Sequence, residues 1–305
     1  MSQTSESRSS PVLARTAILL VRVLGWLPLA WLRRLARAVA LLVVRLPNRY
    51  RAISDLNLRM AFPDLPSAER RTLLRRSLQE TVVTVFEQAA VWQAPLEELR
   101  RLETEAEGEE LLEASRSQGD GTLLLLPHLG NWEMLSPLLN RRGTAVGVYR
   151  RPRIREVDGF LREARERFGL HMVPASPAGL RPLVRALRDN EMAIILPDQE
   201  PPRGHGVHAP FFGVPAYTMT FVSRVLRLTG AVPLFVCCLR QPSGGFRLHF
   251  LPAPPGLADP DPESAAASLN RGVENCVALS PEQYLWAYKR FSTPPAGLVS
   301  PYREL

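Results

Sequence analysis

A histidine and a glutamate five residues apart, His128 and Glu133, are the residues of this sequence best placed to do chemistry. They lie in the segment 122–139, which reads TLLLLPHLGNWEMLSPLL. Its apolar start is typical of a buried strand that runs into Pro127, and Asn131 stands where the N-cap of a following helix is expected. His128 is therefore expected at the carboxyl end of a strand, which is where ligands and reactive groups collect in open α/β sheets.

Such a pair could act as a general base and the carboxylate that orients it. A neutral imidazole can remove a proton from a hydroxyl, while a carboxylate on its other nitrogen fixes the tautomer and stabilises the imidazolium. Residues five apart on one continuous helix differ in direction by roughly 140°. The two side chains therefore converge only if the chain folds back between them, and Gly130 allows that bend. Spacing alone also fits a buried histidine that binds a carbonyl group and a glutamate that favours the first turn of a helix.

Strands and helices alternate along the second half of the chain. The apolar patterns predict strands at 144–148, 172–174, 192–196, 232–238 and 246–251, and helices at 157–168, 179–188 and 218–228. This alternation predicts an α/β fold with a mostly parallel or mixed central sheet flanked by helices. A long helix at 67–92 is expected to pack on the core. We expect residues 51–305 to form one domain behind an N-terminal segment, residues 1–50.

The N-terminal segment 1–50 has a polar start followed by a basic, apolar stretch. Residues 17–32 are apolar apart from Arg22 and Pro28. This run of roughly 16 residues is shorter than the about 20 that cross a membrane, but the arginines behind it suit anionic lipid head groups. We expect an N-terminal membrane anchor, single-pass or interfacial, with the rest of the chain on the cytoplasmic face. Small residues at 36–40 also fit a signal-peptide cleavage site, but the arginines directly after the apolar run argue against it.

Composition narrows the classes of partner. The three cysteines, two of them adjacent, give no disulfide framework and fit cytosolic thiols. The formal net charge is +8 and the pI is about 10.1, yet the basic residues concentrate around the apolar segment and no nucleic-acid motif is present. A membrane surface therefore suits this charge better than nucleic acid does. No metal site is expected, because His205 and His208 lie in a glycine-flanked run that is typical of a loop.

The segment HLGNWE resembles the H-x4-E motif of the lipid A biosynthesis acyltransferases, the lauroyl and myristoyl transferases within the lysophospholipid acyltransferase superfamily. The resemblance covers about residues 20–292. Further blocks in family order lie at 57–63, 149–152, 196–199, 209–212 and 281–286. The resemblance implies a glycerolipid acyltransferase-like fold with an N-terminal membrane-anchoring helix at the bacterial inner membrane.

The reaction that this resemblance implies is the transfer of a fatty acyl chain from a thioester to a hydroxyl of a lipid A precursor. The expected donor is acyl-acyl carrier protein, with acyl-CoA as the other possibility, and the enzyme needs no cofactor because the donor carries phosphopantetheine. His128 would be the base and Glu133 its orienting group, without an acyl-enzyme intermediate. Backbone N–H groups around Gly130 and Asn131, or an arginine, are the candidate oxyanion donors.

Substrate-binding residues are expected beside this pair. Tyr149 and Arg150 follow the strand at 144–148, and matching to the family places Arg165 in the next helix. An arginine fork binds phosphate in bidentate fashion, so Arg150 and Arg165 are candidates to hold the acceptor's phosphate or the donor's phosphopantetheine.

A second set of candidate residues, Asp198, Gln199 and Arg203, follows the strand at 192–196. Three roles stay open for Asp198: it could orient an arginine, support the His128 pair, or cap the following loop. The residues 209–212 fit either a wall of the acyl pocket or the core.

Two other functions remain compatible with the sequence. A relative with the same base could acylate a different lipid, such as a lysophospholipid, a phosphatidylinositol mannoside or an aryl polyene lipid. A non-catalytic membrane lipid-binding protein is the second alternative, and the intact His128 and Glu133 pair argues against it.

Overall fold

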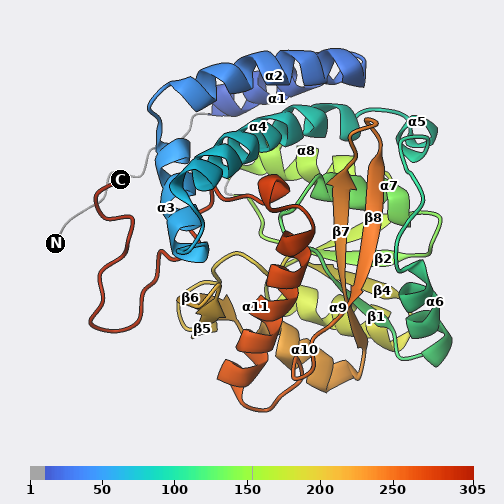
Figure 1. Cartoon of the computed structure of the whole chain (residues 1–305). Coiled ribbons are helices and arrows are strands. Elements are labelled where there is room, and N and C mark those ends of the chain that lie inside the picture. The colour runs from blue at the N-terminus through green and yellow to red at the C-terminus, as the bar shows by residue number, and fades with distance from the viewer. Residues whose placement is uncertain (1–10, 153) are drawn as a thin grey trace.

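A mixed six-stranded sheet forms the centre of the molecule (Figure 1). The computed structural model describes residues 11–152 and 154–305, so the expected polar start of the chain lies outside the described residues. The strand order is β3-β2-β4-β1-β7-β8, and only the β7–β8 pair is antiparallel within this sheet. The strands are β1 (Thr122–Leu125), β2 (Ala145–Tyr149), β3 (Leu170–Pro174), β4 (Met192–Ile195), β7 (Val232–Arg240) and β8 (Phe246–Pro252). The predicted α/β class with a mixed sheet is confirmed.

Both faces of the sheet are covered because its central strands are apolar on both sides. In β1, Leu123 and Leu125 join one core cluster, while Leu124 and the following Leu126 join the other. This two-sided burial explains why β1 reads as a continuous apolar run and not as an alternating one. The first cluster includes residues of α3 (Arg49–Ala61), α9 (Pro177–Arg188), α10 (Phe221–Thr229) and α11 (Pro262–Leu279). The second includes residues of α5 (Leu96–Arg100), α6 (Glu109–Gln118) and α7 (Leu135–Leu139).

The long helix α4 (Ser67–Val91) agrees closely with its predicted range, and α8 (Arg155–Glu166) connects β2 to β3. A separate antiparallel hairpin, β5 (Gly206–Phe211) and β6 (Val214–Met219), was not predicted, because its glycine- and proline-rich sequence is typical of a loop. The tip of this hairpin enters the core: Phe211 is almost fully buried and packs near Tyr284 and Phe291. Of the two roles left open for residues 209–212, the structure favours core packing for Phe211.

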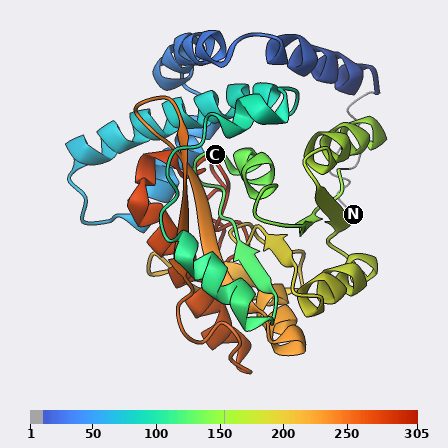
Figure 2. The same cartoon turned by 90° about the vertical axis from the view of Figure 1, so that its right-hand side faces the viewer.

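The N-terminal stretch forms two helices, α1 (Pro11–Gly25) and α2 (Leu29–Arg45), that pack over α4. Pro28 ends the expected continuous apolar stretch, since α1 stops before it and α2 begins directly after it. Figure 2 shows the two helices following one another across the top of the molecule. None of the helices in the described part of the chain combines the length and the hydropathy that a membrane span requires.

Candidate active site

Strand register brings His128 and Asp198 together. β1 and β4 are parallel neighbours, and Leu125 pairs with Ile195. Each strand is followed by Leu-Pro, so the third residue after this pair is His128 on one segment and Asp198 on the other. His128 Nδ1 lies 2.8 Å from Asp198 Oδ1, and the backbone N–H of His128 donates to Asp198 Oδ2 at 2.9 Å.

Asp198 fixes the tautomer of the imidazole. Burial alone would raise the pKa of Asp198, but the charge of His128 and its hydrogen bonds outweigh burial and hold that pKa below its ordinary value. The ionised carboxylate accepts the Nδ1 proton, which leaves Nε2 as a lone-pair acceptor. The carboxylate on the imidazole therefore belongs to Asp198, and the prediction that Glu133 holds the second ring nitrogen is wrong. Of the roles left open for Asp198, the support of His128 is the one that this geometry favours.

Glu133 binds an arginine and a tryptophan instead. Arg165 donates from Nε to Glu133 Oε2 at 3.0 Å and from Nη2 to Oε1 at 2.5 Å, and Trp92 Nε1 donates to Oε2 at 3.1 Å. Burial would raise the pKa of Glu133, but the charge and hydrogen bonds of Arg165, the Trp92 hydrogen bond and the charge of His128 lower it overall. Glu133 is thus a buried, ionised carboxylate that lies near His128 without a hydrogen bond to it. Because one edge of the Arg165 guanidinium is bound to Glu133, that edge is not open to a phosphate.

The turn between His128 and Glu133 is clamped through its backbone. Gly130 has φ +65°, and a Cβ at this position would lie 2.1 Å from the carbonyl oxygen of Cys238, so glycine is required. The Gly130 N–H donates to Gln283 O at 3.0 Å, and the Asn131 N–H donates to Cys238 O at 2.9 Å. Both of these N–H groups are occupied by backbone carbonyls and are not free to act as oxyanion donors, which leaves an arginine or a neighbouring N–H group as the predicted donor. The expected side-chain cap by Asn131 is also absent, because the Asn131 amide binds Glu87 at 3.1 Å.

The segment around η2 (Pro281–Gln283) fixes the other side of this turn. Besides the Gln283 contact, Leu285 N–H donates to His128 O at 3.0 Å, and Leu129 and Tyr284 form an antiparallel bridge. The conspicuous sequence block 281–286 therefore holds the backbone of the histidine loop in place. Burial and the neighbouring Asp198 raise the pKa of the Tyr284 hydroxyl well above its ordinary value.

The remaining predicted residues lie at differing distances from the imidazole. Gln199 is adjacent to it, with its Nε2 3.2 Å from His128 Nε2. Tyr149 is buried and its hydroxyl donates to Asp158 at 2.9 Å, so that hydroxyl supports α8. Arg150 and Arg203 are exposed on the loops that follow β2 and β4.

A cavity of about 740 Å³ lies between the α1–α2 turn, the end of α4 and α8. Its lining includes Trp26, Leu29, Trp92 and Phe160, and Trp92 is the residue that donates to Glu133. A second hollow of about 420 Å³ runs on between α1 and α8 and shares Phe160 with the first. Pockets of this size and apolar character accommodate lipid- or drug-sized ligands. Within the described parts of the chain, no group of three His, Cys, Asp or Glu side chains could hold a metal ion.

Comparison with known proteins identifies the family of the chain. The family model described as bacterial lipid A biosynthesis acyltransferase matches residues 3–293. The chain belongs to the bacterial lipid A biosynthesis acyltransferases.

Similar relatives include three enzymes of Escherichia coli K12. The chain is 29% identical to a lipid A biosynthesis lauroyltransferase over 280 residues, which is 90% of each chain. It is 28% identical to a lipid A biosynthesis palmitoleoyltransferase over 84% of this chain and 83% of the relative. It is 26% identical to a lipid A biosynthesis myristoyltransferase over 84% of this chain and 79% of the relative. The protein is accordingly an acyltransferase.

Several residues that build this acyltransferase site were not singled out from the sequence. They are Trp92, Glu87 and Arg240. One usable signal was present: Glu87 is a lone acidic residue in the otherwise apolar and neutral run 81–92, and Arg240 ends a buried strand. An isolated charge in an apolar run is buried only when it is paired, so each such charge predicts a partner.

Proposed function

We propose that the protein transfers a fatty acyl chain from a thioester donor to a hydroxyl of a lipid A precursor, with His128 as general base. The observation that carries the proposal is the His128–Asp198 pair, which leaves Nε2 unprotonated at the carboxyl end of β1 in a chain of this family. The acceptor is taken from the names of the relatives, which are lipid A biosynthesis enzymes.

The reaction proceeds by direct displacement. His128 Nε2 takes the proton of the acceptor hydroxyl while the oxygen bonds to the thioester carbonyl carbon. The tetrahedral intermediate then collapses, the C–S bond breaks, and the imidazolium returns the proton to the departing thiolate. The products are an ester and a free thiol, and the proton count balances on His128.

Three groups assist the base in distinct ways. Asp198 keeps the proton on Nδ1, and the negative charge of Glu133 stabilises the imidazolium that forms. Gln199 places its amide next to Nε2, so the acceptor hydroxyl takes the place of this amide on binding. The displaced amide is then a donor for the oxyanion, in place of the occupied backbone N–H groups of the turn.

The donor is proposed to be an acylated carrier protein. Arg150 and Arg203 are exposed on the loops that follow β2 and β4. These loops lie at the same carboxyl edge of the parallel strands as His128, which follows β1. Exposed arginines attract an acidic carrier protein and bind the phosphate of its phosphopantetheine. Acyl-CoA offers the same phosphopantetheine arm and is the competing donor in the assay. The acyl chain is assigned to the cavity beside Trp92.

We propose that α1 and α2 lie in the membrane interface on its cytoplasmic face, without crossing it. These helices and the turn between them carry exposed apolar side chains next to exposed arginines. The apolar set is Leu19, Leu20, Val23, Trp26, Leu27, Trp31, Leu35, Leu41 and Leu42, and the basic set is Arg34, Arg37 and Arg45. This combination is typical of interfacial helices that bind anionic lipids.

One assay on the wild type and one variant tests the function. Purified protein is incubated with dodecanoyl-carrier protein or dodecanoyl-CoA and a lipid A precursor, and the products are identified by mass spectrometry. We expect one added acyl chain with the wild type and none with folded His128→Ala. Transfer by His128→Ala at the wild-type rate would refute the role of the base. Transfer only to a different lipid, such as a lysophospholipid, would refute the acceptor.

A further inference from the structure

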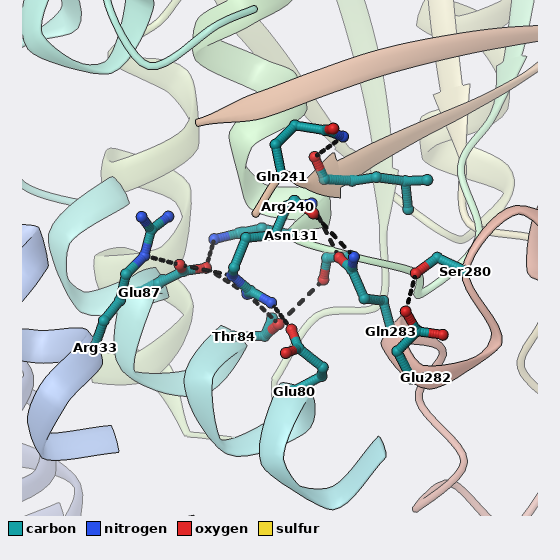
Figure 3. A network of polar contacts seen from close by, with 12 residues as sticks. Arg33, Glu80, Thr84, Glu87, Asn131, Arg240, Gln241, Ser280, Glu282 and Gln283 are labelled. Atoms are coloured by element: carbon teal, nitrogen blue, oxygen red, sulfur yellow. Dashed lines mark hydrogen bonds and ion pairs between the residues drawn. The ribbon is translucent and has the colours of Figure 1, made fainter. Parts of the chain in front are cut away.

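A buried cluster of charged side chains contacts the His128–Glu133 turn on the side that faces α4 (Figure 3). At its centre is Glu87 of α4, whose side chain has no exposed surface. Arg33 Nε donates to Glu87 Oε1 at 2.6 Å, and Arg240 donates to both Glu87 oxygens, from Nε at 2.8 Å and from Nη2 at 2.5 Å. Arg240 also pairs with Glu80. We refer to Arg33, Glu80, Glu87 and Arg240 as the Glu87 cluster, in which two negative charges balance two positive ones.

The Glu87 cluster holds the turn by two hydrogen-bonded links. The side-chain amide of Asn131 donates to Glu87 Oε2 at 3.1 Å. Arg240 Nη2 donates to Thr84 Oγ1 at 2.9 Å, and Thr84 in turn donates to Gly130 O at 3.2 Å. The turn therefore receives a side-chain and a backbone contact from α4, in addition to its backbone bonds to β7 and the 281–286 segment.

The same cluster reaches outward to α2. Arg33 is buried although it lies on a helix whose other arginines are exposed. Its guanidinium also donates to Gly244 O and lies 5.4 Å from the Phe246 ring centroid. A buried carboxylate is costly unless its partners are fixed, so Glu87 holds its position only while Arg33 and Arg240 are in place. The packing of α2 on α4 therefore affects the position of Glu87 and, through Glu87, the position of the Asn131 side chain.

From this geometry we infer that Glu87 is a positioning residue for the His128–Glu133 turn, and that Arg33 makes this positioning depend on how α2 packs against α4. The inference rests on the proposed function, since it concerns the rate of the same reaction. None of these side chains binds His128, Asp198 or Glu133, so their effect on catalysis is transmitted by the backbone of Gly130 and Asn131. A displaced base costs kcat steeply while substrate binding is largely retained.

The test uses Arg33→Gln, Asn131→Ala and the double variant in the full-length chain. Two properties are measured: hydrogen–deuterium exchange of the peptide covering 128–133, and kcat and KM for transfer from dodecanoyl-carrier protein to a lipid A precursor in detergent micelles. We expect each single substitution to lower kcat by about tenfold with KM changed less than about twofold, and to accelerate exchange in 128–133. Because both residues belong to one chain of contacts, the double variant should lose little more than either single variant.

Arg76→Gln is the matched control, because it removes the same charge from an exposed position on α4. The inference would be overturned if Arg33→Gln had the same kcat as Arg76→Gln and the same hydrogen–deuterium exchange in 128–133. It would also be overturned if the kcat losses of the two single variants multiplied in the double variant. If Arg33→Gln fails to fold, Asn131→Ala decides, since it leaves all four charges of the Glu87 cluster paired. Absence of transfer by the wild type would refute the proposed function, while exchange in 128–133 would still test the positioning.

Discussion

Replacing Asp198 by asparagine tests the assignment of the orienting carboxylate. In the wild type one carboxylate oxygen accepts from His128 Nδ1 at 2.8 Å and the other from the His128 backbone at 2.9 Å. An asparagine has one oxygen and one NH2 group, so it satisfies only one of these donors. If its oxygen stays on the backbone N–H, its NH2 faces Nδ1 and the proton moves to Nε2. If the amide turns over, its NH2 meets the backbone N–H, and two donors face each other.

Either arrangement removes the base or displaces it. A wrong imidazole tautomer in a comparable catalytic arrangement costs about 10⁴ in kcat, which corresponds to about 5 kcal/mol in the activation free energy. We expect Asp198→Asn to lose about 10³- to 10⁴-fold in single-turnover acyl transfer, with a far smaller effect on the binding of the donor. Asp189→Asn at the C-cap of α9 is the control, because Asp189 is an exposed residue that pairs with the exposed Arg185. A folded Asp198→Asn that stays within about tenfold of wild-type kcat would refute this reasoning.

The same substitution changes acid stability. The folded pKa of Asp198 lies below its ordinary value, so its contribution to the free energy of unfolding is present above about pH 4 and is lost as the pH falls through the folded pKa. We expect the stability of Asp198→Asn to fall less steeply below about pH 4 than that of the wild type, as measured by urea unfolding at a series of pH values. Identical slopes would show that Asp198 is not the ionised partner of His128.

Substitutions at Glu133, Arg165, Gly130 and Leu29 probe the rest of the site. Glu133→Gln leaves Arg165 without its partner and should cost about 3 kcal/mol in urea unfolding. Adding Arg165→Gln should restore stability but not activity, and recovered activity would show that Glu133 acts only through its pairing. Gly130→Ala should destabilise the fold by about 3 kcal/mol or more, because its Cβ would meet a carbonyl oxygen, and a wild-type melting temperature would contradict that. Leu29→Trp narrows the cavity and should shift donor preference toward shorter acyl chains, whereas the exposed control Leu42→Trp should not.

Local sequence patterns predicted the strands of the central sheet and the helices between them, but not the partner of the base. The strands, the helices between them and the position of His128 at a strand end follow from apolar runs of the right length. Which carboxylate reaches the imidazole depends on which strands are neighbours, and β4 pairs with β1 although β2 and β3 lie between them in the sequence. No local pattern encodes that order. The β5–β6 hairpin was missed for a related reason, since its stability comes from burying Phe211 in a core that distant segments build.

The fold determines where the Glu133 side chain points relative to His128. The backbone does turn back at Gly130, but the turn directs Glu133 toward α4 and α8, where Trp92 and Arg165 bind it. The site therefore contains two buried carboxylates with separate partners, and each has a lowered pKa for its own reason. Asp198 contacts the imidazole and sets its tautomer, whereas Glu133 adds negative charge nearby and pairs with Arg165. If the base depended on a single carboxylate, removing the other would leave the rate of transfer unchanged. With two, loss of Asp198 should abolish the lone-pair form of Nε2, whereas loss of Glu133 should leave that tautomer intact and lower kcat only through the missing negative charge. The kcat values of Asp198→Asn and Glu133→Gln therefore distinguish the two roles.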